Sequence, residues 1–171
     1  MSHWQNQLKY DPISVLLAAT DPALVYFVRR DLLSEDPGPI EQLWELPAAR
    51  KILKKQRPDG SWPRPGKPSR LPINDGLIET WRQLRYLVEQ YGFTRQHPQI
   101  DQAARFVFSC QAQAGDFRGF IGHQYATYYP GALLALLVKA GFRDDPPIKK
   151  AFNWLLEMRQ QDGGWVIPAQ Q

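Results

Sequence analysis

The heptapeptide Gln56-Arg-Pro-Asp-Gly-Ser-Trp62 is matched twice further along the chain, by Gln111–Phe117 and by Arg159–Trp165. The second copy ends in Phe instead of Trp, and the third begins with Arg instead of Gln. The copies align without a gap at offsets of 55 and 48 residues. Self-similarity at a spacing of roughly fifty residues is typical of repeat proteins, in which each copy is one supersecondary unit. The sequence therefore predicts an array of repeated units.

The residues before each heptapeptide have the spacing of an amphipathic helix. In the third copy, apolar residues recur at positions i, i+3, i+4 and i+7, which places them on one helical face. Pro98 and Pro146 stand where a first helical turn would begin, a position at which proline loses no hydrogen bond. We expect each of these helices to end at a glycine, which accepts the left-handed conformation needed there. The three glycines are Gly60, Gly115 and Gly163.

A second kind of helix follows the first two heptapeptides. Leu77–Tyr91 and Pro130–Ala140 are each followed by glycine. Ala132–Val138 is apolar on all sides, as in a helix that is buried over most of its surface. No segment alternates apolar and polar residues over the length of a strand. The sequence thus predicts an all-α, two-layered array with amphipathic outer helices and drier inner helices.

The chain divides into an N-terminal segment, residues 1–36, and the repeats, residues 37–171. Asp11-Pro12 and Asp21-Pro22 each have the form of a capping residue followed by a first-turn proline, and the second helix should run to about Leu33. We expect the N-terminal segment to pack on the array. Ser61–Pro72 is rich in proline and should form a loop.

Composition restricts the class of protein. The formal net charge is +4, and Cys110 is the only cysteine, so no intramolecular disulfide can form. The longest apolar run is far shorter than the roughly 20 residues of a membrane span, so we expect no transmembrane segment. The start of the chain lacks the features of a signal peptide, and a cytoplasmic location fits these observations.

The heptapeptides resemble the Gln-and-Trp repeat, Gln-x-x-x-Gly-x-Trp, of squalene and hopene cyclases, which protein prenyltransferases carry in weaker form. The resemblance covers roughly residues 40–171 and implies an α/α toroid, here a partial ring of helical hairpins. It also implies that each Gln bridges to a neighbouring helix end and that each aromatic residue stacks on it. The structural repeat residues would be Gln56, Gly60, Trp62, Gln111, Gly115, Phe117, Gly163 and Trp165.

The chain departs from the catalytic patterns of these enzymes. It has no Asp-x-Asp-Asp acid, and Asp144-Asp-Pro-Pro-Ile148 lacks the last carboxylate of an Asp-Asp-x-x-Asp magnesium motif. The zinc site of prenyltransferases needs Asp, Cys and His, and no spacing links Cys110 to His97 or His123. We therefore expect no metal site and no cofactor.

Two catalytic candidates and four aromatic residues are expected at the mouth of a central cavity. Asp75 and Glu79 stand at the start of one inner helix, where an acid could protonate an alkene beside aromatic rings that stabilise a cation. In the structural alternative Asp75 caps that helix and the aromatic residues fill the core. The aromatic candidates are Trp81, Tyr125, Tyr128 and Tyr129.

A basic tract runs from Arg50 to Arg70, with eight Lys or Arg residues and one acid. Its anion-binding candidates are Arg64, Lys67 and Arg70, although basic residues at this density are usually a solvated surface. The loop has no interleaved aromatic residues, so we expect no nucleic-acid partner.

Two hypotheses of function follow. In the first, the repeats bind an apolar or isoprenoid ligand, or a protein partner, without catalysis. In the second, the chain is part of an isoprenoid cyclase or prenyltransferase completed by a C-terminal half or a second subunit. In both, the apolar face of Phe152, Leu155 and Leu156 lacks a following inner helix, so we expect a homo-oligomer or further repeats to cover it.

Overall fold

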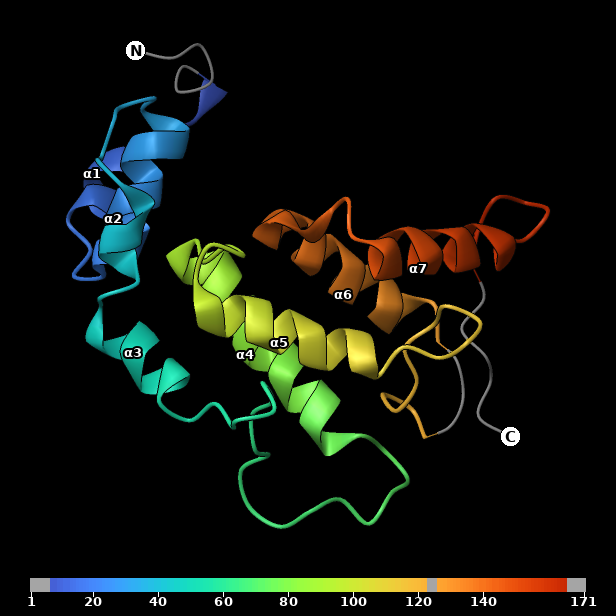
Figure 1. Cartoon of the computed structure of the whole chain (residues 1–171). Coiled ribbons are helices and arrows are strands. Elements are labelled where there is room, and N and C mark those ends of the chain that lie inside the picture. Colours follow the sequence, from blue (N-terminus) through green and yellow to red (C-terminus); the bar gives the residue numbers. More distant parts are fainter. Residues whose placement is uncertain (1–6, 123–125, 166–171) are drawn as a thin grey trace.

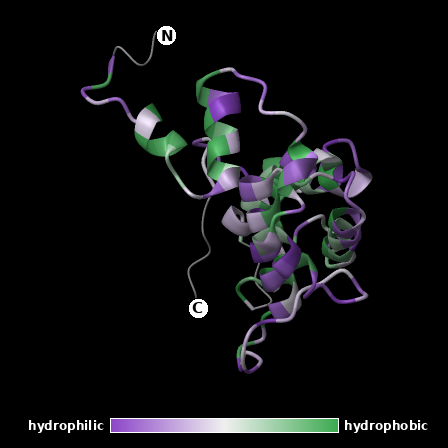
Figure 2. Cartoon of the chain, turned by 90° about the vertical axis from the view of Figure 1, so that its left-hand side faces the viewer, coloured by the Kyte–Doolittle hydropathy of each residue, from purple (hydrophilic) through white to green (hydrophobic). Residues whose placement is uncertain are grey.

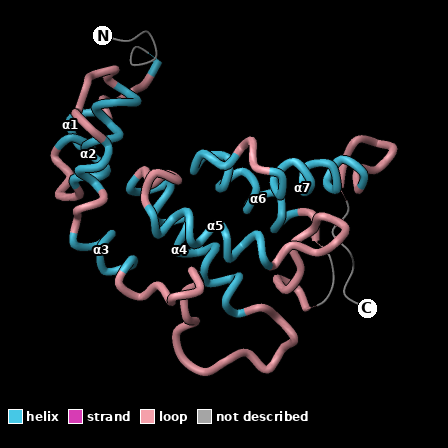
Figure 3. The backbone as a smooth tube through the Cα atoms, viewed as in Figure 1, coloured by secondary structure: helices cyan, strands magenta, loops and turns pink. Residues whose placement is uncertain are grey.

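The computed structural model describes residues 7–122 and 126–165, and the regular structure in these ranges is helical (Figures 1 and 3). An isolated β-bridge joins Gln111 to Phe117. The all-α prediction is confirmed. The α-helices are α1 (Ile13–Leu17), α2 (Pro22–Phe27), α3 (Pro47–Leu53), α4 (Asp75–Tyr91), α5 (Pro98–Ser109), α6 (Tyr128–Leu137) and α7 (Pro146–Glu157). Shorter 3-10 or π-helical pieces are η2 (Val28–Leu32), η3 (Ile40–Leu43) and η4 (Val138–Phe142).

The helices begin and end as local chemistry requires. Pro47, Pro98 and Pro146 are the first residues of α3, α5 and α7, where the missing N–H would have had no helical partner. At the other end, Gly92 closes α4 with a φ of 63° and Gly141 lies in the last turn after α6 with a φ of 95°. Both angles are left-handed and suit glycine.

The helices form two layers in a curved array, with the α1–α2 pair at one end and α7 at the other (Figure 1). Inner helices α2, α4 and α6 contact one another in chain order, α4 also contacts α3 and α5, and α6 contacts α7. Helix α6 buries Leu133, Leu134 and Leu137 completely, as its all-round apolar sequence predicts. Apolar positions collect on the inward sides of the helices (Figure 2). These contacts make the two-layered α/α arrangement.

The N-terminal segment shares the hydrophobic core of the repeats. Ala23 and Tyr26 on α2 belong to the same buried cluster as Leu84 and Leu87 on α4. The Tyr26 hydroxyl also donates to the carbonyl oxygen of Gly38 at 2.9 Å. The segment therefore adds a first inner helix to the array.

Two local predictions were wrong. The outer helices end at Leu53, Ser109 and Glu157, several residues before the glycines that we expected to end them. Helix α4 is capped by Asn74, whose side chain accepts the N–H of Leu77, and not by Asp75. In both cases loop contacts, which a helical pattern does not reveal, decide where the chain turns.

Candidate functional site

The loops that carry the three heptapeptides have the same backbone hydrogen bonds. In each loop the second residue donates its N–H to the carbonyl of the sixth at 2.8 Å, and the glycine donates back to the second residue at 2.9 Å. The first of these bonds joins Arg57 to Ser61, Ala112 to Asp116 and Gln160 to Gly164 in the three loops. The sequence repeat is therefore a structural repeat.

The first side chain of each heptapeptide closes its loop, but only two of them reach a neighbouring helix. Gln56 and Gln111 donate to the carbonyl of the glycine in their own loops. Each also donates at 2.8 Å to a carbonyl in the first turn of the next outer helix, Gln99 in α5 and Pro147 in α7 respectively. Arg159 donates through Nε to Gly163 at 2.9 Å, and has no such second acceptor among the described residues.

The glycines show the same difference between the repeats. A Cβ on Gly60 would overlap the backbone carbonyl of Gln102 in α5, and one on Gly115 would lie 2.9 Å from the carbonyl oxygen of Lys150 in α7. A Cβ on Gly163 would meet only the flexible side chain of Arg159. The first two loops are pressed against a following outer helix, and the third loop is open on that side.

The aromatic residues repeat in their bonding but not in their burial. The Trp62 indole donates to the carbonyl of Ile52 at 2.8 Å, and the Trp165 indole donates to Leu155 at 2.7 Å. These acceptors occupy equivalent positions in the repeat. Trp62 and Phe117 are 1% exposed, whereas Trp165 is 47% exposed. Among the described residues, no further repeat follows to cover Trp165.

An open groove of about 490 Å³ lies beside Trp165, between α6 and α7. Its lining is mostly apolar: Thr127, Tyr128, Gly131, Ala132, Leu155 and Trp165. Leu156, on α7, is also largely exposed. We call this feature the α6–α7 groove.

Three of the equivalent positions one repeat earlier are buried. Alignment of the outer helices places Val107 at the position of Leu155 and Phe117 at that of Trp165, and alignment of Gly92 with Gly141 places Glu79 at that of Tyr128. Val107 and Phe117 are buried in the cluster to which α6 contributes its leucines, and Glu79 is also buried. The groove is therefore where the next inner helix of the repeat would pack.

The residues matched to known proteins lie mainly in these repeats. The sequence model of the squalene-hopene cyclase C-terminal domain matches residues 79–170, more than half of the chain. The chain belongs to this family. In this chain the cyclase C-terminal domain family match begins within α4 and includes two of the three heptapeptides.

Other comparisons add little to the family assignment. A crystal structure described as that of a protein from Actinoplanes is similar with a TM-score of 0.47 and 23% sequence identity. The similarity covers 71% of this chain and 35% of that chain, so this chain spans about a third of its length. No curated protein sequence matches.

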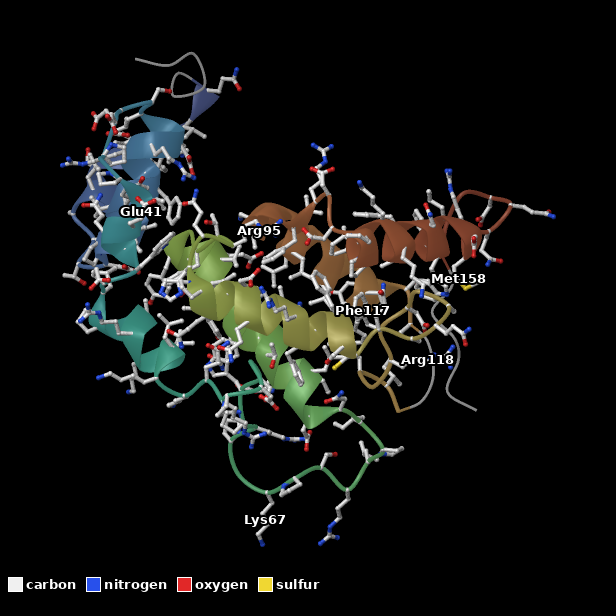
Figure 4. All side chains as sticks on the ribbon, in the orientation of Figure 1. Glu41, Lys67, Arg95, Phe117, Arg118 and Met158 are labelled. Carbon is white, nitrogen blue, oxygen red and sulfur yellow. The ribbon has the colours of Figure 1, made fainter. Side chains whose placement is uncertain are left out.

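In this cyclase-family chain, the Asp75 carboxylate binds two residues of the proline-rich loop, residues 61–72. Its Oδ1 accepts from Arg64 at 2.6 Å, and its Oδ2 accepts the N–H of Ser69 at 2.8 Å. The Ser69 N–H and then the Arg64 guanidinium lower the pKa of the Asp75 carboxyl. Arg64 is therefore engaged within the chain, whereas Lys67 and Arg70 make no ion pair in the described part, and Lys67 points outward from the loop (Figure 4).

Glu79 has different surroundings from Asp75. It is 4% exposed, and its carboxylate accepts from Gln83 and lies 3.4 Å from the Arg82 guanidinium. A buried carboxylate needs such partners because desolvation of a lone charge is costly. Asp75 thus contacts the proline-rich loop, whereas Glu79 contacts neighbouring residues of α4.

The structure brings three of the aromatic candidates together and adds a fourth ring. Trp81 meets Tyr129 edge-on at 6.2 Å and Phe120 at 5.9 Å. Phe120 and Tyr129 stack at 5.0 Å, and Tyr128 meets Tyr129 edge-on at 5.3 Å. Tyr125 lies outside the described residues. Phe120 was not predicted, because no repeat position marks it.

Asp116 is a second residue that sequence reasoning missed. It is fully buried, its Oδ2 accepts from Arg118 at 2.7 Å, and its Oδ1 has no hydrogen-bond partner among the residues that the structure describes. Its equivalents, Ser61 and Gly164, are uncharged. The sequence could have indicated Asp116 through its carboxylate, because the other two copies have an uncharged residue at this repeat position.

Two further features of the described residues bear on function. The described residues contain no group of three His, Cys, Asp or Glu side chains placed to hold a metal ion. None of their helices combines the length and the apolar character needed to cross a bilayer.

Proposed function

We propose that this member of the squalene-hopene cyclase C-terminal domain family is a binding module whose α6–α7 groove takes an apolar helix from a protein partner, without catalysis. The observation that carries the proposal is the difference in burial between equivalent residues. Phe117 is 1% exposed and Trp165 is 47% exposed, although both follow the same loop geometry. An apolar surface of this kind gains free energy when a partner covers it.

The form of the groove favours a helix over a small molecule. Small-molecule sites enclose 70–90% or more of their ligand, and the α6–α7 groove is open along one side. Helices bind in open grooves through apolar side chains on one face. One repeat earlier, Val107 and Phe117, at the positions of Leu155 and Trp165, are part of a core to which helix α6 contributes.

The catalytic hypothesis has weaker support from the acid candidates. A proton donor should keep a raised pKa, whereas the pKa of Asp75 is lowered and its two oxygens are occupied by Arg64 and Ser69. Asp75→Ala and Glu79→Ala remain its direct test. Turnover of an isoprenoid substrate by the wild-type chain that both substitutions abolish, with folding intact, would establish an enzyme.

The binding proposal is tested with a labelled peptide of residues 128–142, the α6–η4 sequence, with terminal lysines added for solubility. Fluorescence anisotropy should show saturable binding to the wild-type chain. Ala132→Arg puts a charged side chain into the groove and should weaken binding at least about tenfold. Tyr86→Arg is the control, because Tyr86 is 42% exposed and does not line the groove.

Farnesol is added in a second titration to separate the two kinds of apolar ligand. Displacement of the peptide by farnesol at low concentration, with the same dependence on Ala132, would assign the groove to an isoprenoid-class molecule instead of a helix. Absence of any peptide binding to the wild-type chain would overturn the proposal. Thermal unfolding of each variant shows that it is folded.

A further inference from the structure

The chain contains three Asp-Gly dipeptides: Asp59-Gly60, Asp75-Gly76 and Asp162-Gly163. In such a dipeptide the backbone nitrogen of glycine can attack Cγ of the aspartate, because glycine has no side chain to hinder the approach. A bond forms between the nitrogen and Cγ, and the carboxyl hydroxyl leaves as water with the proton of the nitrogen. The product is a five-membered succinimide.

Water then opens the succinimide at one of its two carbonyl carbons. Opening at Cγ restores aspartate. Opening at the α-carbonyl breaks its bond to the glycine nitrogen and gives isoaspartate, in which the main chain runs through Cγ and a free α-carboxylate remains. Both steps need only water, so the rate in a folded protein depends on how readily the backbone brings the glycine nitrogen to Cγ.

The dipeptide at the start of α4 is restrained by the helix. Asp75 and Gly76 are the first two residues of α4. The carboxylate of Asp75 is bound by Arg64 and by the N–H of Ser69. Cyclisation at this dipeptide therefore requires the first turn of the helix to open and the carboxylate to lose both partners.

The dipeptide in the first repeat loop, Asp59-Gly60, is restrained by the following outer helix. Gly60 is buried, and a Cβ there would overlap the carbonyl of Gln102 in α5. The Gln102 side chain donates to the carbonyl of Pro58. Gln56 donates to the carbonyl of Gln99 at 2.8 Å. Opening this loop breaks bonds and packing between two repeats.

The carboxylates of these two dipeptides are also held in their ionised form. The Ser61 N–H and then its hydroxyl lower the pKa of the Asp59 carboxyl. The Ser69 N–H and then Arg64 lower the pKa of the Asp75 carboxyl. Because the hydroxyl of the protonated carboxyl is the group that leaves as water, a lowered pKa slows cyclisation.

The dipeptide in the third repeat loop, Asp162-Gly163, has only local restraints. Asp162 is exposed, and a Cβ on Gly163 would meet only the side chain of Arg159. The Gly163 N–H donates to Gln160 and the Gly164 N–H donates to Asp162 Oδ1, both at 2.9 Å within the loop. Among the described residues, no hydrogen bond joins this loop to a helix other than α7. Opening costs least where so few contacts hold the backbone.

We propose that Asp162-Gly163 is a site of spontaneous isoaspartate formation in the folded chain, and that the fold protects the other two dipeptides. The enzyme class that acts on the product is an isoaspartyl carboxyl methyltransferase. It transfers a methyl group from S-adenosylmethionine to the free α-carboxylate and releases S-adenosylhomocysteine. The added backbone methylene lies close to the α6–α7 groove, since Trp165 follows Gly163 by two residues. The inference does not depend on the proposed function.

The test follows the full chain during storage at neutral pH and physiological temperature. Samples are digested, isoaspartate is located by mass spectrometry, and its amount is measured by methylation with an isoaspartyl methyltransferase. Asp162 should convert at least about tenfold faster than Asp59, because two hydrogen bonds to α5 hold the first loop closed. Asp75 should also convert more slowly than Asp162. In urea the three dipeptides should convert at similar rates, because only local sequence then differs.

Variants separate the effect of the fold from that of the dipeptide. Gln56→Ala removes the bond to Gln99 and should speed conversion at Asp59 while leaving the rate at Asp162 unchanged. Gln102→Ala removes only the bond to Pro58 and is the milder variant if Gln56→Ala does not fold. Asp162→Glu should abolish the signal at that position, because its cyclisation would need a six-membered ring.

Two results would overturn the inference. One is equal conversion of Asp59 and Asp162 in the folded wild-type chain. The other is an unmodified Asp162 in the folded chain under conditions in which the urea-unfolded chain converts. Circular dichroism of the stored samples shows that the chain stays folded during the measurement.

Discussion

The side chain of Gln111 joins two repeat units, since its Nε2 donates to the carbonyl oxygen of Pro147 in the first turn of α7 at 2.8 Å. The same Nε2 donates to Gly115 in its own loop at 2.9 Å. Arg159, at the equivalent position, makes the bond within the loop but, among the described residues, no bond to another unit. Comparison of substitutions at Gln111 and Arg159 therefore shows how much the bond between repeats stabilises the chain beyond the bond within the loop.

Substitution of Gln111 by Ala should lower the free energy of unfolding by about 1–3 kcal/mol, because it removes two hydrogen bonds, one within the loop and one to α7. Arg159→Ala removes an exposed side chain and should lower it by about 0.5 kcal/mol or less. Urea denaturation of both variants measures the difference. Equal losses would show that the bond between repeats contributes nothing.

Gly60 and Gly163 should respond differently to the same substitution. Both have a positive φ, so alanine is strained by about 1 kcal/mol at either site. At Gly60 the added Cβ also overlaps the Gln102 carbonyl, a backbone atom that cannot move without shifting α5. We expect Gly60→Ala to lose at least about 2 kcal/mol and Gly163→Ala about 1 kcal/mol. Thermal or urea unfolding tests this order, which equal losses at the two sites would contradict.

Ser34 is the one non-glycine residue with a positive φ, 56°, among the described residues. It follows η2 as Gly92 follows α4. Relief of left-handed strain by Ser34→Gly should stabilise the chain by up to about 1 kcal/mol, reduced by the extra freedom that glycine gives the unfolded state. A rise in the midpoint of unfolding supports this account, and a fall would mean that the serine side chain makes a contribution of its own.

His97 should make stability depend on pH. Burial lowers the pKa of its imidazole below 6.5, and its Nδ1 accepts the N–H of Gln99 at the start of α5. The unfolded chain therefore binds a proton more readily than the folded chain as the pH falls through about 6.5, so this contribution is complete above that pH and declines below it. His97→Asn keeps a capping acceptor without a titrating ring. Its unfolding midpoint should change less than that of the wild type between pH 7.5 and 5.5, and identical changes would exclude His97 as the cause.

Local sequence was enough to predict the helices and their layers. The first-turn prolines of α5 and α7 and the glycines after α4 and α6 act through the backbone of one or two residues, so their effect does not depend on the rest of the fold. The all-round apolar sequence of α6 likewise requires burial, whatever covers it. The same local reasoning failed for Gly60, because its role is to let α5 approach the loop.

The candidate site depended on contacts between distant segments. Asp75 lies beside Arg64 and Ser69 only because the proline-rich loop folds back on α4. The spacing of residues in the sequence does not predict how this loop folds. Phe120 joins Trp81 and Tyr129 for the same reason. The chemistry available to each of these residues was therefore not readable from residue type alone.

The sequence by itself determined the repeat, its helical character and its likeness to the cyclase family, because periodicity and turn residues act over a few neighbouring positions. Only the tertiary structure decided which copies of the repeat are complete. Trp62 and Trp165 have the same sequence context and the same indole hydrogen bond, yet one is buried and the other is not. Burial depends on which helices a neighbouring segment brings close, and that is a property of the assembled array rather than of any segment within it.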